Sequence, residues 1–150
     1  MIKVQTQDFN IAEEYALLSD NNQTDGAVVF FVGLVRDFNQ NSQIKSLTLE
    51  HYPAMTDKVL TRLEQQAKTR WPVNRVAIVH RVGELNLSEQ IVFVGVTSPH
   101  RDAAFEAAQF IMDQLKTRAP FWKKEQTMQG EHWVDAKDSD EQAAKAWNNS

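Results

Sequence analysis

The side chains best suited to chemistry in this sequence gather between His100 and Lys124. The segment Ser98-Pro99-His100-Arg101 follows an apolar stretch and precedes a helical pattern, so it places a histidine and an arginine at a helix N-terminus. Free backbone N–H groups and the helix dipole favour an anion at such a position, and an arginine fork fits phosphate or carboxylate. The sequence leaves open a simpler alternative, a capping turn whose histidine faces solvent.

Lysines form the second part of this basic cluster. Lys116 stands beside Arg118 at the predicted end of the same helix. Lys123 and Lys124 follow an apolar anchor, Pro120-Phe121-Trp122. Lysines that are crowded by like charges and partly buried have lowered pKa values, which suits proton transfer or nucleophilic attack. The alternative is that lysines near a helix C-terminus stabilise its dipole, and for Lys116 taken alone the sequence favours that alternative.

A third candidate is Gly33-Leu34-Val35-Arg36, where a cation follows an apolar strand pattern. Strand ends are common ligand positions, and Gly33 would allow a ligand or another backbone to approach closely. An ordinary surface arginine is the alternative, and this tetrapeptide by itself favours it.

The composition narrows the class of function. The chain has 150 residues, the size of one domain spanning 1–150, and it contains no cysteine. Disulfides, a thiol nucleophile and thiolate metal sites are therefore excluded. A net charge of −4 argues against a nucleic-acid binder, since such proteins usually carry a basic excess. The sequence shows no signal peptide and no apolar run near the roughly 20 residues that span a bilayer, so we expect no membrane contact and a cytoplasmic protein.

Several familiar motifs are missing from the sequence. We find no phosphate-binding glycine loop, dinucleotide fingerprint or nucleophile elbow. The four histidines, at positions 51, 80, 100 and 132, lack metal-ligand spacing. We therefore expect no metal and no cofactor, and we expect His51 and His80 to be structural.

Hydrophobic periodicity predicts the elements that position these residues. The apolar segment 27–35 indicates a central strand, and 44–51 is expected to pair with it. Strands and helices mix without regular β-α-β alternation, which favours an α+β fold with a mostly antiparallel sheet and packed helices. The long helix has a small-residue face, Ala104, Ala107 and Ala108, which suits close packing on a sheet or on another subunit. Strands are predicted over 2–6, 27–35, 44–51, 73–80 and 90–97, extended chain over 121–133, and helices over 11–18, 55–71, 98–119 and 139–147.

Four segments of the sequence carry a similarity when they are taken together. They are Leu49-Glu50-His51-Tyr52-Pro53, His80-Arg81-Val82-Gly83-Glu84-Leu85, the stretch from Val92 to Arg101, and the stretch from Leu115 to Glu125. They resemble a known family, the catalytic large subunit of molybdopterin synthase. The similarity runs from the first strand to about Trp147, and Lys116 to Glu125 is its most specific part.

The resemblance implies a sulfurtransferase of molybdenum cofactor biosynthesis, with a hammerhead-type element in its α+β fold. Members of the family convert cyclic pyranopterin monophosphate (precursor Z) into molybdopterin. The two sulfurs come from the C-terminal Gly-Gly thiocarboxylate of a small ubiquitin-like sulfur-carrier subunit, which agrees with the absence of cysteine here. The implied assembly is a homodimer of large subunits within a heterotetramer.

The resemblance also implies a set of site residues. We hypothesise that Arg36, His100 and Arg101 hold the phosphate. Lys116 would activate the thiocarboxylate and Lys123 would assist proton transfer, which makes these two lysines the catalytic pair. Leu34 stands where some relatives have a lysine and Lys124 where some have an arginine, so neither side chain is expected to be essential. The substrate-binding positions are Leu34, Val35, Arg36, His100, Arg101, Lys116, Lys123, Lys124 and Glu125.

The spacing of these residues adds an inference of its own. His100 and Lys116 lie 16 residues apart on one predicted helix, which is roughly 24 Å. A pterin monophosphate is too short to touch both, so one site that uses both must be shared between two chains, with the small-residue face as a candidate contact. Two other functions remain: a non-catalytic module that docks a ubiquitin-like tail, and an RNA-binding domain. The retained lysines argue against the first, and the acidic net charge against the second.

Overall fold

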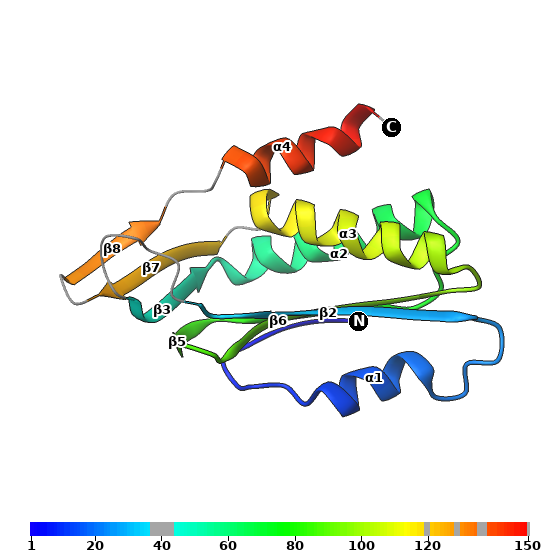
Figure 1. Ribbon diagram of the computed structural model, residues 1–150, viewed down its shortest axis with the longest axis horizontal. Coiled ribbons are helices and arrows are strands. Elements are labelled where there is room, and N and C mark those ends of the chain that lie inside the picture. Colours follow the sequence, from blue (N-terminus) through cyan, green and yellow to red (C-terminus); the bar gives the residue numbers. More distant parts are fainter. Residues whose placement is uncertain (37–43, 119–120, 128–129, 135–137, 150) are drawn as a thin grey trace.

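Two four-stranded sheets and four α-helices make up the computed structural model, which describes residues 1–36, 44–118, 121–127, 130–134 and 138–149 (Figure 1). The strands are β1 (Ile2–Gln5), β2 (Ala27–Leu34), β3 (Ile44–His51), β4 (Val76–Arg81), β5 (Gly83–Asn86), β6 (Gln90–Ser98), β7 (Phe121–Thr127) and β8 (Gly130–Val134). The helices are α1 (Ile11–Ser19), α2 (Pro53–Arg70), α3 (Arg101–Arg118) and α4 (Asp138–Ala146), and a 3-10 turn, η1 (Trp147–Asn149), follows α4.

The sheet with more strand residues, called the larger sheet below, has the strand order β1-β4-β6-β2. Only its β1–β4 pair is parallel. Helices α2 and α3 cover one face and α1 covers the other (Figure 1). Side chains alternate across a strand, so Ile78 of β4 packs beneath α2 and α3, whereas Ala77 and Val79 pack with Leu18 of α1. Gly95 of β6 makes room for α1, because a Cβ there would lie 2.5 Å from Leu18 Cδ1.

The smaller sheet has the order β5-β3-β7-β8 and is antiparallel throughout. It lies at one end of the larger sheet, beyond the C-terminal end of α3 (Figure 1). Its buried side chains Leu47, Leu49 and Leu85 form a cluster with Val35, which follows β2. The strand that carries Lys123 is therefore held by the smaller sheet, and the helix that carries Lys116 by the larger one.

Local sequence signals set the ends of the helices. The side chain of Asn10 caps α1 by accepting a hydrogen bond from the backbone N–H of Glu13 at 3.0 Å. Pro53 occupies the first turn of α2, where its missing N–H costs nothing. The small-residue face of α3 is buried in the core against the larger sheet. That face therefore meets a sheet rather than another subunit, and the candidate subunit contact at Ala104, Ala107 and Ala108 is wrong.

The structure confirms the α+β fold with mostly antiparallel strands and corrects two details of it. β2 is an edge strand rather than a central one, and it exposes 42% of Phe30 and 44% of Phe31. β3 pairs with β5 and β7 rather than with β2. The physical reason is that β3 alternates apolar and polar residues, which suits a sheet with one buried face. Strand β5 was not predicted, because its four residues carry too little apolar pattern.

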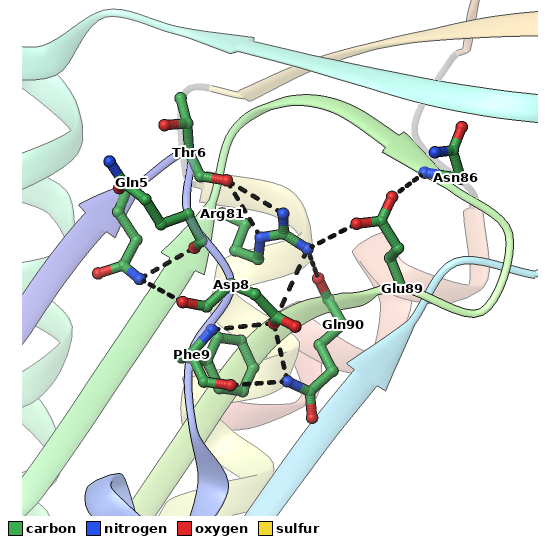
Figure 2. A network of polar contacts seen from close by, with 9 residues as sticks. Gln5, Thr6, Asp8, Phe9, Arg81, Asn86, Glu89 and Gln90 are labelled. Carbon is green, nitrogen blue, oxygen red and sulfur yellow. Dashed lines mark hydrogen bonds and ion pairs between the residues drawn. The ribbon is translucent and has the colours of Figure 1, made fainter.

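A buried arginine joins three segments of the larger sheet (Figure 2). Arg81 is 6% exposed. Its Nη2 and Nε donate to the carbonyl of Thr6 at 3.0 and 3.3 Å, and its Nη1 donates to the carbonyl of Gln90 at 2.9 Å. Two carboxylates face the same guanidinium, Glu89 at 3.4 Å and Asp8 at 3.9 Å. Arg81 thus links the chain after β1, the end of β4 and the turn before β6.

The carboxylate of Asp8 is held in place by its neighbours. Gln90 Nε2 donates to Asp8 Oδ1 at 2.9 Å and to the carbonyl of Phe9 at 2.9 Å. The hydrogen bond from Gln90 lowers the pKa of Asp8, and the charge of Arg81 acts in the same direction. Asp8 therefore stays ionised at neutral pH and keeps its contact with Arg81.

Within the described ranges, no helix is both long and apolar enough to cross a lipid bilayer.

Replacing Arg81 with Met should lower the free energy of unfolding by about 3 kcal/mol, because two carbonyl oxygens lose their donors and two partly exposed carboxylates lose the buried guanidinium that they face. Urea denaturation at neutral pH measures this loss. Arg62 on α2 is an exposed arginine, and the matched control Arg62→Met should change the same quantity by less than about 0.5 kcal/mol. Equal effects of the two substitutions would contradict a special role for Arg81.

Candidate active site

Helix α3 places the predicted site residues at two distant ends. His100 and Arg101 lie at its start and Lys116 lies in its last turn. The helix has 18 residues, which corresponds to about 27 Å. All three side chains are exposed. The length of α3 therefore confirms the predicted separation of His100 from Lys116 within one chain.

The turn before α3 is fixed by hydrogen bonds to neighbouring segments. Ser98 Oγ donates to the carbonyl of Pro72 at 2.8 Å and accepts from the backbone N–H of His100 at 3.1 Å. Gly26, just before β2, donates to the carbonyl of Ser98 at 3.0 Å. A Cβ on Gly26 would lie 2.8 Å from the carbonyl oxygen of Pro99. These contacts fix the backbone of His100 and leave its side chain open to solvent.

Arg36 lies at the opposite end of the larger sheet from His100. Ala27 pairs with Ser98 and Leu34 pairs with Gln90, so β2 runs from the His100 end to the far end. Nine residues of β6 separate those ends, which is about 26 Å. Arg36 and the His100–Arg101 pair are therefore not brought together within one chain.

The neighbours of Arg36 show how it is anchored. Val35 is buried, its N–H donates to the carbonyl of Glu89 at 2.9 Å, and its carbonyl accepts from Ser88 at 2.8 Å. Leu34 is 55% exposed. The buried side chain and paired backbone of Val35 hold Arg36 on the turn before β6, whose Glu89 also contacts Arg81.

The two predicted catalytic lysines lie toward the same end of the fold as Arg36. The chain reverses between β6 and α3, so the C-terminal end of α3 comes back over the β7 side of the molecule (Figure 1). Lys123 pairs with Leu49 of β3 and with Val134 of β8. Lys116 and Lys123 are both exposed, so the single chain does not provide the partial burial that suits a lysine to proton transfer or nucleophilic attack.

Lys124 and Glu125 complete the predicted set. Their backbones pair with Thr48 and Leu47 of β3. Their side chains lie outside the part of the chain that the structure describes.

Two histidines lie beside strand β7, which carries Lys123, although residue type and spacing provide no chemical reason to group them with that strand. The ring of His80 stacks on that of Phe121 with centroids 3.9 Å apart and planes 18° apart. The ring of His51 lies 6.0 Å from the same phenylalanine, and its Nδ1 is 3.1 Å from Thr56 Oγ1. The segments His51-Tyr52-Pro53 and His80-Arg81 belong to the motifs that carried the family resemblance, so the motif contained a signal that residue type alone did not.

Crowding around the ring of His80 keeps it uncharged. Although the residue retains some solvent exposure, burial lowers its pKa to about 4, and the charges of Lys123 and His51 act in the same direction. A hydrogen bond between Nδ1 and the carbonyl of Arg81, 2.8 Å long, opposes that effect. The neutral ring therefore uses Nδ1–H as its donor.

A groove of about 270 Å³ between α2 and α3 is not part of this arrangement. Arg62, Arg70, Phe110 and Arg118 line it among others, and none of the predicted site residues does. Among the described residues no cluster of three histidines or carboxylates could hold a metal ion. The predicted site residues therefore fall into two separate groups, called half-sites below: His100 with Arg101 at the start of α3, and Arg36, Lys116 and Lys123 toward the opposite end of the fold.

The pKa of His80 leads to a pH-dependent stability. The unfolded chain takes up a proton as the pH falls through 6.5, whereas the folded chain does so only near 4. Folding therefore loses stability as the pH falls between these values and regains it as the pH rises, by up to about 3 kcal/mol. In His80→Phe this contribution disappears. The free energy of unfolding, measured with urea at several pH values between 4 and 6.5, should therefore depend less steeply on pH in His80→Phe than in wild type. An equal pH dependence of the free energy of unfolding in the two proteins would contradict the lowered pKa of His80.

Comparison with known proteins shows the family to which the chain is similar. The family model described as MoaE protein matches residues 4–118. Over 146 residues the chain is 56% identical to the molybdopterin synthase catalytic subunit of Escherichia coli K12, with 97% of each chain covered. The molybdopterin biosynthesis MoaE protein of Burkholderia ambifaria has a TM-score of 0.84 at 47% identity, covering 99% of this chain and 97% of that one.

A more distant solved structure shares the fold. It is a complex of subunits 1 and 2 of the molybdopterin-converting factor of Helicobacter pylori, with a TM-score of 0.72 at 21% identity, covering 89% of this chain and 90% of that one. The family match spans well over half of the chain and the identity to the Escherichia coli relative extends over nearly all of it. This chain belongs to the MoaE protein family.

Proposed function

We propose that this chain is the catalytic large subunit of a molybdopterin synthase. It converts cyclic pyranopterin monophosphate into molybdopterin, and the sulfur comes from the C-terminal thiocarboxylate of a small ubiquitin-like subunit. The observation that carries the proposal is the pair of cationic half-sites at the two ends of α3, in a chain 56% identical to a molybdopterin synthase catalytic subunit.

Each half-site has a separate task in this proposal. His100 and Arg101 bind the substrate phosphate through an open helix start and an arginine fork. Lys116 lies beside the thiocarboxylate and stabilises the negative charge that develops when sulfur leaves the carbonyl carbon. Lys123 assists proton transfer to the pterin. Since Arg36 lies at the lysine end, it reaches the phosphate from the side opposite to Arg101.

The distance between the half-sites supports a site shared by two copies of the chain. Arg101 and Lys116 are separated by most of a helix of about 27 Å, so a substrate as small as a pterin monophosphate cannot bridge them within one chain. A second copy can supply the missing half. The exposed Phe30 and Phe31 lie on opposite faces of edge strand β2 and make this edge of the sheet apolar on both sides, which suits such a homodimer.

The open lysine end supports binding of a small partner subunit. Lys116 and Lys123 are exposed, so the flexible tail of another protein can reach both, and its entry would provide the burial that the single chain lacks. The complex of two subunits in Helicobacter pylori molybdopterin-converting factor supports the same assembly here. The chain contains no cysteine, so the sulfur must arrive on a partner.

Lys116→Ala and Lys123→Ala should each lower turnover by about 100-fold or more, because each removes a charge that acts in the reaction. The measurement combines the protein with thiocarboxylated partner and cyclic pyranopterin and follows dithiolene formation. Lys68→Ala is the control, since Lys68 is an exposed lysine of α2 whose contact is a surface ion pair with Glu64. Undiminished turnover in Lys116→Ala would overturn the mechanism.

Mixing two inactive variants tests whether the site is shared. Arg101→Ala and Lys116→Ala chains, reassorted at equal amounts, should regain about a quarter of wild-type activity, because half of the dimers are hybrids and each hybrid has one intact site. Mixing Arg101→Ala with His100→Ala is the control and should regain nothing, since both changes affect the same half-site. Arg36→Ala should restore activity with Arg101→Ala and not with Lys116→Ala. No recovery in the first mixture would contradict a shared site.

A further inference from the structure

The stacked pair His80–Phe121 joins the two sheets at the point where the lysine-bearing strand begins. His80 is the fifth residue of β4 in the larger sheet, and Phe121 is the first residue of β7 in the smaller one. Their centroids are 3.9 Å apart and their planes differ by 18°. Because β4 and β7 do not pair directly with each other, a face-to-face contact of this kind adds a side-chain constraint on the distance and the tilt between them.

Phe121 and Lys123 belong to the same face of β7. They are two residues apart on one strand, and side chains of a strand alternate with a period of two. The register places His51 opposite Phe121 and Leu49 opposite Lys123. A shift of Phe121 therefore moves the lysine beside it, and Lys123 lies close enough to His80 for its charge to act on the imidazole.

The orientation of the His80 ring is fixed by the backbone of its own strand. Its Nδ1 lies 2.8 Å from the carbonyl of Arg81, and Arg81 is itself buried and hydrogen-bonded to Thr6 and Gln90. The imidazole is thus a flat surface of set direction. It is uncharged at neutral pH because burial lowers its pKa to about 4, so it approaches Lys123 without repelling it.

We propose that His80 is a positioning residue for the reaction, and that it sets the place of Lys123 through its stack with Phe121. The inference rests on the proposed function of Lys123. It goes beyond that function because it assigns a role to a side chain that takes no part in the chemistry.

The test compares His80→Ala, which removes the ring, with His80→Phe, which keeps a flat ring. In the assembled enzyme His80→Ala should lower kcat by about tenfold or more, because a displacement near 1 Å has effects of this size. KM for cyclic pyranopterin should stay within about twofold, since other side chains hold the phosphate. His80→Phe should keep kcat within about threefold of wild type, because stacking is retained.

Ile78→Val is the matched structural control. Ile78 lies two residues earlier on the same face of β4 and packs in the core beneath α2 and α3. It should lower the melting temperature with kcat unchanged. A loss of kcat in Ile78→Val as large as that in His80→Ala would show that any weakening of β4 has the same effect, and the inference would be wrong.

Two further measurements separate this inference from the proposed function. If Lys123→Ala abolishes turnover and His80→Ala does not, only the role of His80 is overturned. If Lys123→Ala retains full turnover, the proposed role of Lys123 fails, and the role of His80 fails with it. Should His80→Ala not fold, His80→Leu replaces it, because leucine fills the space without a ring. A kcat for His80→Leu equal to that of His80→Phe would then overturn the inference.

Discussion

The last two residues of strand β4, His80 and Arg81, position the segments that carry Arg36 and Lys123. His80 and Arg81 are consecutive, so their side chains leave the strand on opposite faces. Arg81 holds Glu89 and the carbonyl of Gln90, and the same turn pairs with Val35 and so carries Arg36. His80 stacks on Phe121 and so reaches the strand of Lys123. The positions of Arg36 and Lys123, which are distant in the sequence, thus both depend on one short stretch of backbone at the end of β4.

Helix α3 adds a second constraint, its length. A rigid helix of 18 residues keeps His100 and Lys116 apart whatever else changes in the chain. Ala104, Ala107 and other core residues press it against β2 and β6, so it has no freedom to bring its ends together. In the proposed function, completion of the site by a second copy follows from this helix geometry, and it does not depend on a particular conformation of any loop.

Much of this could be predicted from the sequence, and the exceptions have physical causes. The long helices and the strongly apolar β6 follow from local periodicity, and four motif segments taken together, with Lys116 to Glu125 the most specific, predicted the family. Strand neighbours could not be predicted, because β2 and β3 are adjacent in sequence and belong to different sheets. The contact of Arg81 with Thr6 joins residues 75 positions apart, and no local pattern encodes it. The exposure of Lys116 and Lys123 could not be predicted, because like-charge crowding in the sequence does not show which side chains are covered in the fold.

The exposed edge of β2 also bears on how the protein behaves in the test tube. β2 is a long apolar edge strand with two exposed phenylalanines. When a partner that covers this edge dissociates on dilution, the apolar surface returns to water and its favourable burial is lost. If a second copy covers it, folding and association are a single equilibrium, and the melting temperature rises with protein concentration. Thermal unfolding curves recorded at different protein concentrations then reflect different proportions of dimer and unfolded chain. The stabilities of variants can therefore be compared only at the same protein concentration.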